Sequence, residues 1–275
     1  MLYPALDIRS NDEDLLLAVV DDFPATAIEE RDGAIRVFFA NAGARDNAQA
    51  HLAPRFDVAA IDVPDEDWAR RSQQDLQPVM VGRITILPGT TYTNPKSPIP
   101  NPISIVIQPS MGFGTGHHAT TRLCLEALQT IDLRGKTVLD AGTGSGILAI
   151  AAARLGAAHA LGLDDDPDAI QAARDNLALN PIEGVTFAVG DLRTFELGPA
   201  DIVTANLTGA LLVRSAGILL GAARPGSSLI LSGLLATERD EVIDAFRGTR
   251  TVWERKHDEW LGLVVRINPP ASSPV

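Results

Sequence analysis

KTVLDAGTGSGILAIAAARLGA, residues 136–157, is the stretch that decides the fold. It begins with a short apolar run, turns at Gly142, Gly144 and Gly146, and continues into an alanine-rich apolar segment. A short apolar run that ends in glycines predicts a buried strand and a tight turn, and the longer apolar segment predicts a helix. Because glycine lets a backbone turn tightly and approach a ligand closely, this turn is a candidate nucleotide-binding site.

Strand-like and helix-like segments alternate from Gly135 onward. The sequence predicts strands at 159–166, 185–191, 200–207 and 228–235, and helices at 167–180, 209–226 and 237–248. Such alternation predicts a doubly wound, mostly parallel α/β sheet with helices on both faces. The closing residues 251–267 predict two further strands, which we expect to form an antiparallel pair at one edge of the sheet.

The first 62 residues predict a separate small α+β domain. Strands are expected at 3–9, 25–30, 34–40 and 56–63, and helices at 14–23 and 44–53. The order strand, helix, strand, strand, helix, strand is that of the ferredoxin-like split βαβ unit. Pro64 followed by acidic residues is a typical helix start, so we expect a connecting helix over 63–77 and a second domain over 78–270.

Composition narrows the class of protein. The chain has 275 residues, 45% of them hydrophobic and 21% charged, which is typical of a folded globular protein. No apolar run approaches the roughly 20 residues of a membrane span, and no basic segment precedes an apolar run at the start, so neither a membrane protein nor a signal peptide is expected. A single cysteine, Cys124, excludes a disulfide within the chain and favours the cytoplasm. The net charge of −12 disfavours direct nucleic-acid binding and favours a basic partner.

A carboxylate follows the glycine turn at a sequence spacing that is typical of nucleotide-binding folds. Asp164 lies eighteen residues after Gly146, at the end of the next expected strand. A carboxylate there can accept both ribose hydroxyls of an adenosine. At the end of the following strand, Asp191 is expected to meet the adenine amino group and Leu192 the adenine face. The alternative is an ordinary turn whose acids cap the next helix.

Glycine spacing distinguishes between nucleotide cofactors. The dinucleotide fingerprint G-x-G-x-x-G would place its third glycine at Ile147, whereas here the glycines run G-x-G-x-G behind Asp140. This spacing fits a methionine-derived nucleoside better than a pyrophosphate, which disfavours a dinucleotide-dependent oxidoreductase. We therefore predict S-adenosyl-L-methionine as the cofactor.

Several ordered blocks resemble one family. GFGTGHHATTRLCLEAL, residues 112–128, resembles the Gly-Thr-Gly-x-His-x-Thr-Thr signature of the ribosomal protein L11 methyltransferase (PrmA) family, and matching blocks follow in order as far as Ile267. The resemblance implies a class I methyltransferase that acts on amino groups of a ribosomal protein, with a first domain that recognises the substrate. Departures include Thr143, His117, Ala119 and the sequence Asn-Leu-Thr at 206–208.

The family's cofactor contacts carry over to particular residues. The resemblance implies contacts from Thr121, Gly142, Asp164 and Asn206. The turn adds Gly144, and the end of the strand at 185–191 adds Asp191, as predicted cofactor-binding residues. Asn206 is also the predicted catalytic residue, because its amide oxygen can hold the attacking amine; its alternative role is to cap the helix that begins near Thr208. Other substrates remain open, either a different protein or a small molecule, as does a non-enzymatic adenosyl-binding protein.

Histidine and tryptophan residues allow weaker predictions. The adjacent His117 and His118 have no Cys or acidic partner at ligand spacing, so we predict no metal site. We expect His118 to order the glycine-rich loop, with a general-base role as the alternative. Thr120 and Thr121 are predicted to cap the helix that follows. Buried packing is expected for Cys124, and packing roles for Trp68, Trp253 and Trp260.

Overall fold

The computed structural model describes residues 2–9, 23, 25–31, 34–64, 77–89, 102–108 and 118–268. The chain forms two compact units, residues 1–75 and 76–275. Trp68, the glycine-rich segment 112–117 and all but the ends of the helices expected at 14–23 and 63–77 lie outside the described residues. Val63 and Pro64, where the second of these helices was expected to begin, belong to a strand instead. Among the described residues, no helix combines the length and the apolar composition that a membrane crossing requires.

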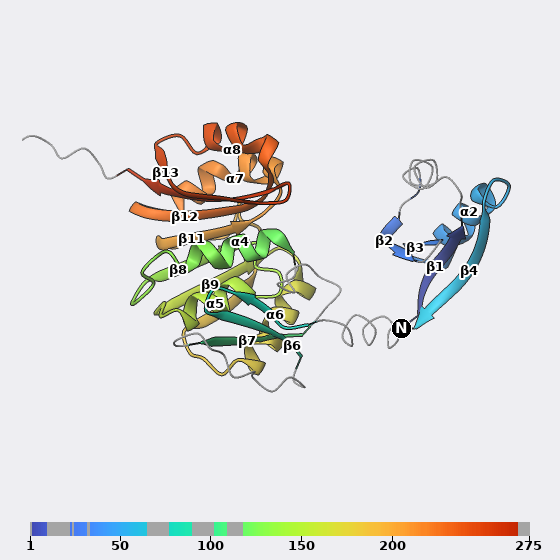
Figure 1. Ribbon diagram of the computed structural model, residues 1–275, viewed down its shortest axis with the longest axis horizontal. Helices are drawn as coiled ribbons and strands as arrows, with labels where there is room; N and C mark the ends of the chain where they lie inside the picture. Colours follow the sequence, from blue (N-terminus) through green and yellow to red (C-terminus); the bar gives the residue numbers. More distant parts are fainter. Residues whose placement is uncertain are drawn as a thin grey trace, which may run out of the picture. The chain divides into compact units, whose positions relative to one another are not determined.

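The first unit contains a four-stranded antiparallel sheet in the order β2-β3-β1-β4. Its elements, drawn in blue in Figure 1, are β1 (Leu2–Arg9), β2 (Ala25–Arg31), β3 (Ala34–Phe39), α2 (Ala42–Leu52) and β4 (Asp57–Pro64). Asn41 caps α2 by accepting a hydrogen bond from the backbone N–H of Ala44. Alternate strand residues such as Leu6, Ile8 and Val37 pack with Leu52 of α2. The four strands and the second helix predicted for this region are confirmed, whereas the helix expected between β1 and β2 lies outside the described residues.

The second unit is built around a seven-stranded sheet in the order β10-β9-β8-β11-β12-β14-β13. Strands β8 to β12 are parallel to one another, and β14 runs antiparallel to both β12 and β13. Its elements are α4 (Ala119–Leu128), β8 (Thr137–Ala141), α5 (Ile147–Arg154), β9 (His159–Asp164), α6 (Pro167–Leu179), β10 (Val185–Val189), β11 (Ala200–Asn206), α7 (Gly209–Gly221), β12 (Ala223–Leu235), α8 (Arg239–Ala245), β13 (Thr249–His257) and β14 (Trp260–Ile267). The predicted doubly wound sheet and its antiparallel edge pair are confirmed.

Helices cover both faces of this sheet because successive strand residues point to opposite sides. Val138, Ile202 and Ile230 belong to the apolar cluster that contains α4, α5 and α6. Leu139 and Val203 belong to the second cluster, which contains α7 and α8 (Figure 1). The carboxyl ends of the parallel strands β8 to β12 therefore meet along one edge of the sheet, between the two helix layers.

A three-stranded sheet precedes α4 in the chain. It comprises β5 (Val79–Val81), β6 (Ile84–Pro88) and β7 (Ile103–Ile107), with β6 antiparallel to β5 and parallel to β7. The sequence predicts one continuous strand over 81–88, and this is wrong because the chain reverses at Gly82, whose φ is +56°. The Gln129 side chain fixes the reversal by donating to the carbonyl of Val81 and accepting from the N–H of Arg83.

Candidate functional site

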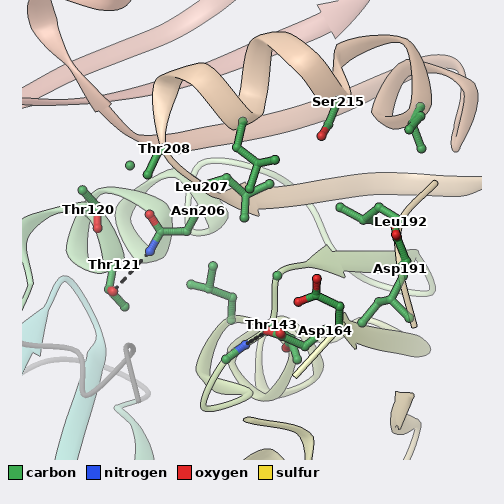
Figure 2. Close-up of a pocket in the computed structure, with 18 of the residues that line it drawn as sticks. Thr120, Thr121, Thr143, Asp164, Asp191, Leu192, Asn206, Leu207, Thr208 and Ser215 are labelled. Atoms are coloured by element: carbon green, nitrogen blue, oxygen red, sulfur yellow. Dashed lines mark hydrogen bonds between the residues drawn. The ribbon is translucent and has the colours of Figure 1, made fainter. Parts of the chain in front are cut away.

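A cavity of about 930 Å³ opens at the carboxyl ends of β8, β9, β10 and β11 (Figure 2). Its volume lies within the range of about 300–1,000 Å³ that is usual for small-molecule sites. Ligands of open α/β sheets bind outside the carboxyl ends of the strands, which is where this cavity lies. Every residue that the sequence analysis selects for cofactor binding lines it, namely Thr121, Gly142, Gly144, Asp164, Asp191 and Asn206.

The glycine turn between β8 and α5 forms the floor of the cavity. Gly142, Gly144 and Gly146 have φ values of +69°, +52° and +80°, in the left-handed region that favours glycine. The N–H of Gly142 donates to the carbonyl of Leu163 at 2.8 Å, which anchors the turn to β9. A Cβ atom at Gly142 would lie 2.5 Å from Cδ2 of Leu207, so a side chain there would force this cavity wall to move. The turn is therefore shaped for a ligand that lies against the main chain.

Asp164 presents its carboxylate to the cavity from the end of β9. Its Oδ2 accepts a hydrogen bond from the N–H of Gly144 at 2.9 Å, and its Oδ1 accepts one from Asp166 at 3.2 Å. Each oxygen keeps a further acceptor position, which suits two neighbouring hydroxyl groups. The helix-capping alternative applies to Asp166, which is the N-cap of α6 and accepts from the N–H of Asp168.

Asp191 lines the cavity but already has a partner. The Nε atom of Arg193 lies 3.0 Å from each of its carboxylate oxygens, and hydrogen bonds from the Arg193 side chain lower the pKa of Asp191 to about 2. If Asp191 accepts a hydrogen bond from an adenine amino group, as predicted, its carboxylate binds that group and Arg193 at the same time. Leu192, the predicted contact for the adenine face, also lines the cavity.

Asn206 ends β11 on the opposite side of the cavity from Asp191 (Figure 2). Its Nδ2 donates to Oγ1 of Thr121 at 3.4 Å, and this bond joins β11 to α4. The alternative role of Asn206 as a helix cap does not apply, because the N-cap of α7 is Thr208. The family resemblance assigns both Thr121 and Asn206 to the cofactor site, and the structure places their side chains side by side.

His118 and Trp260 line the cavity near Thr120. The two rings pack edge to face with centroids 5.0 Å apart. His118 is the N-cap of α4, and its Nδ1 accepts from the N–H of Thr120 at 3.4 Å. The prediction that Thr120 and Thr121 cap this helix is therefore wrong, because the imidazole nitrogen takes the acceptor role of a hydroxyl. Trp260 packs as predicted but also faces the cavity, whereas Trp253 packs against the core.

Asp140 is a functional candidate that sequence reasoning did not develop. Its side chain is buried and accepts hydrogen bonds of 2.6 Å from the hydroxyls of Thr143 and Thr204. Burial raises the pKa of this carboxyl to about 6. Asp140 does not line the cavity, so it acts on the turn and not directly on a ligand. The signal in the sequence is Thr143, three residues after Asp140 and within hydrogen-bonding reach of its carboxylate.

Metal and thiol chemistry have no support among the described residues. Within residues 2–9, 23, 25–31, 34–64, 77–89, 102–108 and 118–268, no three His, Cys, Asp or Glu side chains form a group that would hold a metal ion. Cys124 is completely buried, and burial raises its thiol pKa, so it is a packing residue as predicted.

The site fits S-adenosylmethionine. The glycine turn offers backbone groups without side chains, and Asp164 offers paired acceptors for ribose hydroxyls. Together with the sheet order, these features define a class I S-adenosylmethionine-dependent methyltransferase. More specifically, the chain belongs to the ribosomal protein L11 methyltransferase (PrmA) family, whose model matches residues 15–268.

Curated relatives and solved structures agree with this assignment. A ribosomal protein L11 methyltransferase of Deinococcus radiodurans is 42% identical over 227 residues, which cover 80% of each chain. One from Geobacter sulfurreducens is 41% identical over 263 residues, covering 90% of this chain and 86% of the relative. The crystal structure of the ribosomal protein L11 methylase from Lactobacillus delbrueckii subsp. bulgaricus is 25% identical with a TM-score of 0.63, and the match covers 70% of this chain and 98% of that one.

Proposed function

We propose that this methyltransferase N-methylates lysine or other amino groups of ribosomal protein L11. The observation that carries the proposal is the family match over residues 15–268, which includes most of the small first unit as well as the cofactor-binding unit. The relatives from Deinococcus radiodurans and Geobacter sulfurreducens are both named ribosomal protein L11 methyltransferases. The family match supports the choice of substrate, and the geometry of the cavity supports the role that we give to each residue lining it.

The cofactor-binding roles follow from the walls of the cavity. Gly142 and Gly144 approach the methionine part through their backbone, and Asp164 accepts the ribose hydroxyls. Asp191 and Leu192 lie at the adenine end, and Thr121 lies at the opposite end next to Asn206. Bound S-adenosylmethionine supplies a methyl group on a sulfonium leaving group, so the protein mainly positions and desolvates the attacking amine.

Asn206 is the residue that we propose holds the amine. Because its Nδ2 donates to Thr121, its Oδ1 is the atom that accepts a hydrogen bond from the substrate nitrogen. A lysine must first lose a proton, which costs about 4–5 kcal/mol at pH 7 for a free pKa near 10.4. Apolar walls reduce that cost by disfavouring the ammonium form. Leu148, Leu207 and Trp260 are among the cavity residues that provide such surface.

We further propose that the small domain, residues 1–62, recognises the protein substrate and that residues 63–77 connect it to the catalytic domain, residues 78–270. The net charge of −12 supports a basic protein as partner and disfavours direct binding of nucleic acid. A ribosomal protein substrate and a single buried cysteine support a cytoplasmic location.

Transfer of label from radioactive S-adenosylmethionine tests the substrate assignment. The complete chain is incubated with each purified large-subunit ribosomal protein in turn, and the products are separated before counting. We expect label on L11, with tryptic mapping placing it on lysine or the amino terminus. Label on a different ribosomal protein, and none on L11, would contradict the proposed substrate while leaving the methyltransferase assignment intact.

A further inference from the structure

One wall of the cavity contains a buried hydroxyl that the family comparison does not explain. Ser215 lies on α7 and is 6% exposed, yet it lines the cavity together with Leu211 and Ile218 of the same helix. Figure 2 shows its side chain pointing from α7 into the cavity. Leu211 and Ile218 present apolar side chains on either side of it, and Arg214 of the same helix also lines the cavity.

The Ser215 hydroxyl has no hydrogen-bond partner within the described chain. A serine inside a helix commonly donates to the carbonyl four residues earlier, here that of Leu211, but among the described residues Ser215 makes no such bond. Its oxygen atom is not completely enclosed by protein atoms, so it is accessible from the cavity. A hydroxyl in this position costs free energy when it lacks a partner, and a bound ligand is the group that can provide one.

Chain topology brings α7 to this wall. Strands β10 and β11 are joined by residues 190–199 without an intervening helix, and α7 is the next helix in the chain. Asp191 and Leu192, at the start of that connection, line the same cavity as Ser215. The space between this connection and α7 is therefore lined by apolar side chains, by the ion pair of Asp191 with Arg193, by Arg214 and by the Ser215 hydroxyl.

We infer that Ser215 is a further cofactor-binding residue, whose hydroxyl forms a hydrogen bond with the polar edge of the adenine ring. A purine has two apolar faces and an edge of ring nitrogens and an amino group, which matches the apolar side chains of Leu192, Leu211 and Ile218 together with the Ser215 hydroxyl. The inference rests on the proposed placement of the ribose at Asp164 and of the adenine beside Asp191. It adds a polar contact from α7 to an adenine site otherwise formed by the ends of β9 and β10.

Calorimetric titration with S-adenosylhomocysteine tests the inference, using the full chain and two matched variants. Ser215→Ala removes the hydroxyl, and Ser227→Ala removes a hydroxyl of the same 6% exposure that bonds to the carbonyl of Ala200 outside the cavity. We expect Ser215→Ala to weaken binding about fivefold to tenfold, the effect of one neutral hydrogen bond. Ser227→Ala should bind as tightly as the wild type.

Modified cofactors identify the atom that Ser215 contacts. The titrations are repeated with analogues of S-adenosylhomocysteine that each lack one ring nitrogen or the 6-amino group. We expect one analogue to bind the wild type more weakly than the parent, and Ser215→Ala to abolish that difference. Equal affinity of wild type and Ser215→Ala for the parent compound would overturn the inference, as would an unchanged analogue penalty in the variant. Failure of the wild type to bind would instead overturn the cofactor placement itself.

Discussion

The hydroxyl of Thr143 donates a 2.6 Å hydrogen bond to Oδ2 of Asp140 beneath the glycine turn. Thr204 donates to the other oxygen of the same carboxylate at 2.6 Å. Thr143 belongs to the turn that we place against the cofactor, whereas Thr204 lies two residues before Asn206 on β11. One buried carboxylate therefore couples the cofactor end of the cavity to the strand that carries the proposed amine-binding residue.

Replacing Thr143 with valine should weaken both the fold and the site. Valine keeps the shape but removes the hydroxyl, which leaves one oxygen of Asp140 with fewer partners. We expect a loss of about 1–3 kcal/mol in unfolding free energy and weaker binding of S-adenosylmethionine, measured by urea unfolding and calorimetry. Thr143→Ser is the control, because it keeps the donor and should retain both properties. If Thr143→Val kept the wild-type unfolding free energy and cofactor affinity, the hydrogen bond between Thr143 and Asp140 would contribute to neither.

Stability should depend on pH through Asp140. Burial raises its pKa from 3.8 to about 6, so between these values the folded protein binds the proton more readily than the unfolded chain. The stability contributed by the protonated form is complete below pH 3.8 and is lost as the pH rises through about 6. Relative to Asp140→Asn, the wild type should lose unfolding free energy across this window, by at most about 1.4 kcal/mol per pH unit. A difference that rises with pH would contradict the assignment.

Gly142→Ala should impair cofactor binding more than it impairs folding. The new Cβ would lie 2.5 Å from Cδ2 of Leu207 at the cavity wall, and the residue would adopt a φ of +69°. Gly226→Ala is a matched control, because its φ is +80° and its Cβ would meet nothing within 4 Å. Both variants should lose about 1–2 kcal/mol of stability from left-handed strain. Only Gly142→Ala should also lose cofactor affinity in a calorimetric titration.

Asn206→Ala should slow methyl transfer more than it weakens cofactor binding. Loss of one hydrogen bond to the amine, about 1–3 kcal/mol, corresponds to a roughly fivefold to 150-fold fall in rate. The measurement is single-turnover transfer of labelled methyl to the protein substrate, alongside titration with S-adenosylhomocysteine. An unchanged single-turnover rate would show that Asn206 takes no part in methyl transfer. If the rate fell only as much as the affinity for S-adenosylhomocysteine, Asn206 would act in cofactor binding alone.

Local sequence patterns predicted the parts of the site that depend on chain order. The strand, glycine turn and helix around Gly142 follow from adjacent residues, and Asp164 follows because parallel strands end at one edge of a sheet. Asn206 and Thr121 were predicted from the family resemblance, and in the structure Nδ2 of Asn206 lies 3.4 Å from Oγ1 of Thr121. The order of strands along the chain, in the first unit and from β8 onward in the second, was also predictable from alternating apolar patterns.

Contacts that depend on three-dimensional packing were not predictable in the same way. The His118 cap was missed because preferences for hydroxyl caps are only statistical, and the imidazole of His118 accepts the bond here. The reversal at Gly82 was missed because it depends on the distant side chain of Gln129. The exposure of Ser215 to the cavity depends on how α7 packs against the sheet, which its sequence alone does not specify.

Calorimetric titration of S-adenosylmethionine into Asp164→Ala tests most directly whether the cavity at the carboxyl edge of β8, β9 and β10 binds the methyl donor. Asp175→Ala is the control, because it removes an exposed acid from α6 that does not line the cavity. The ribose assignment predicts no measurable binding to Asp164→Ala and wild-type affinity for Asp175→Ala. Wild-type affinity in Asp164→Ala would contradict the proposed location of the cofactor.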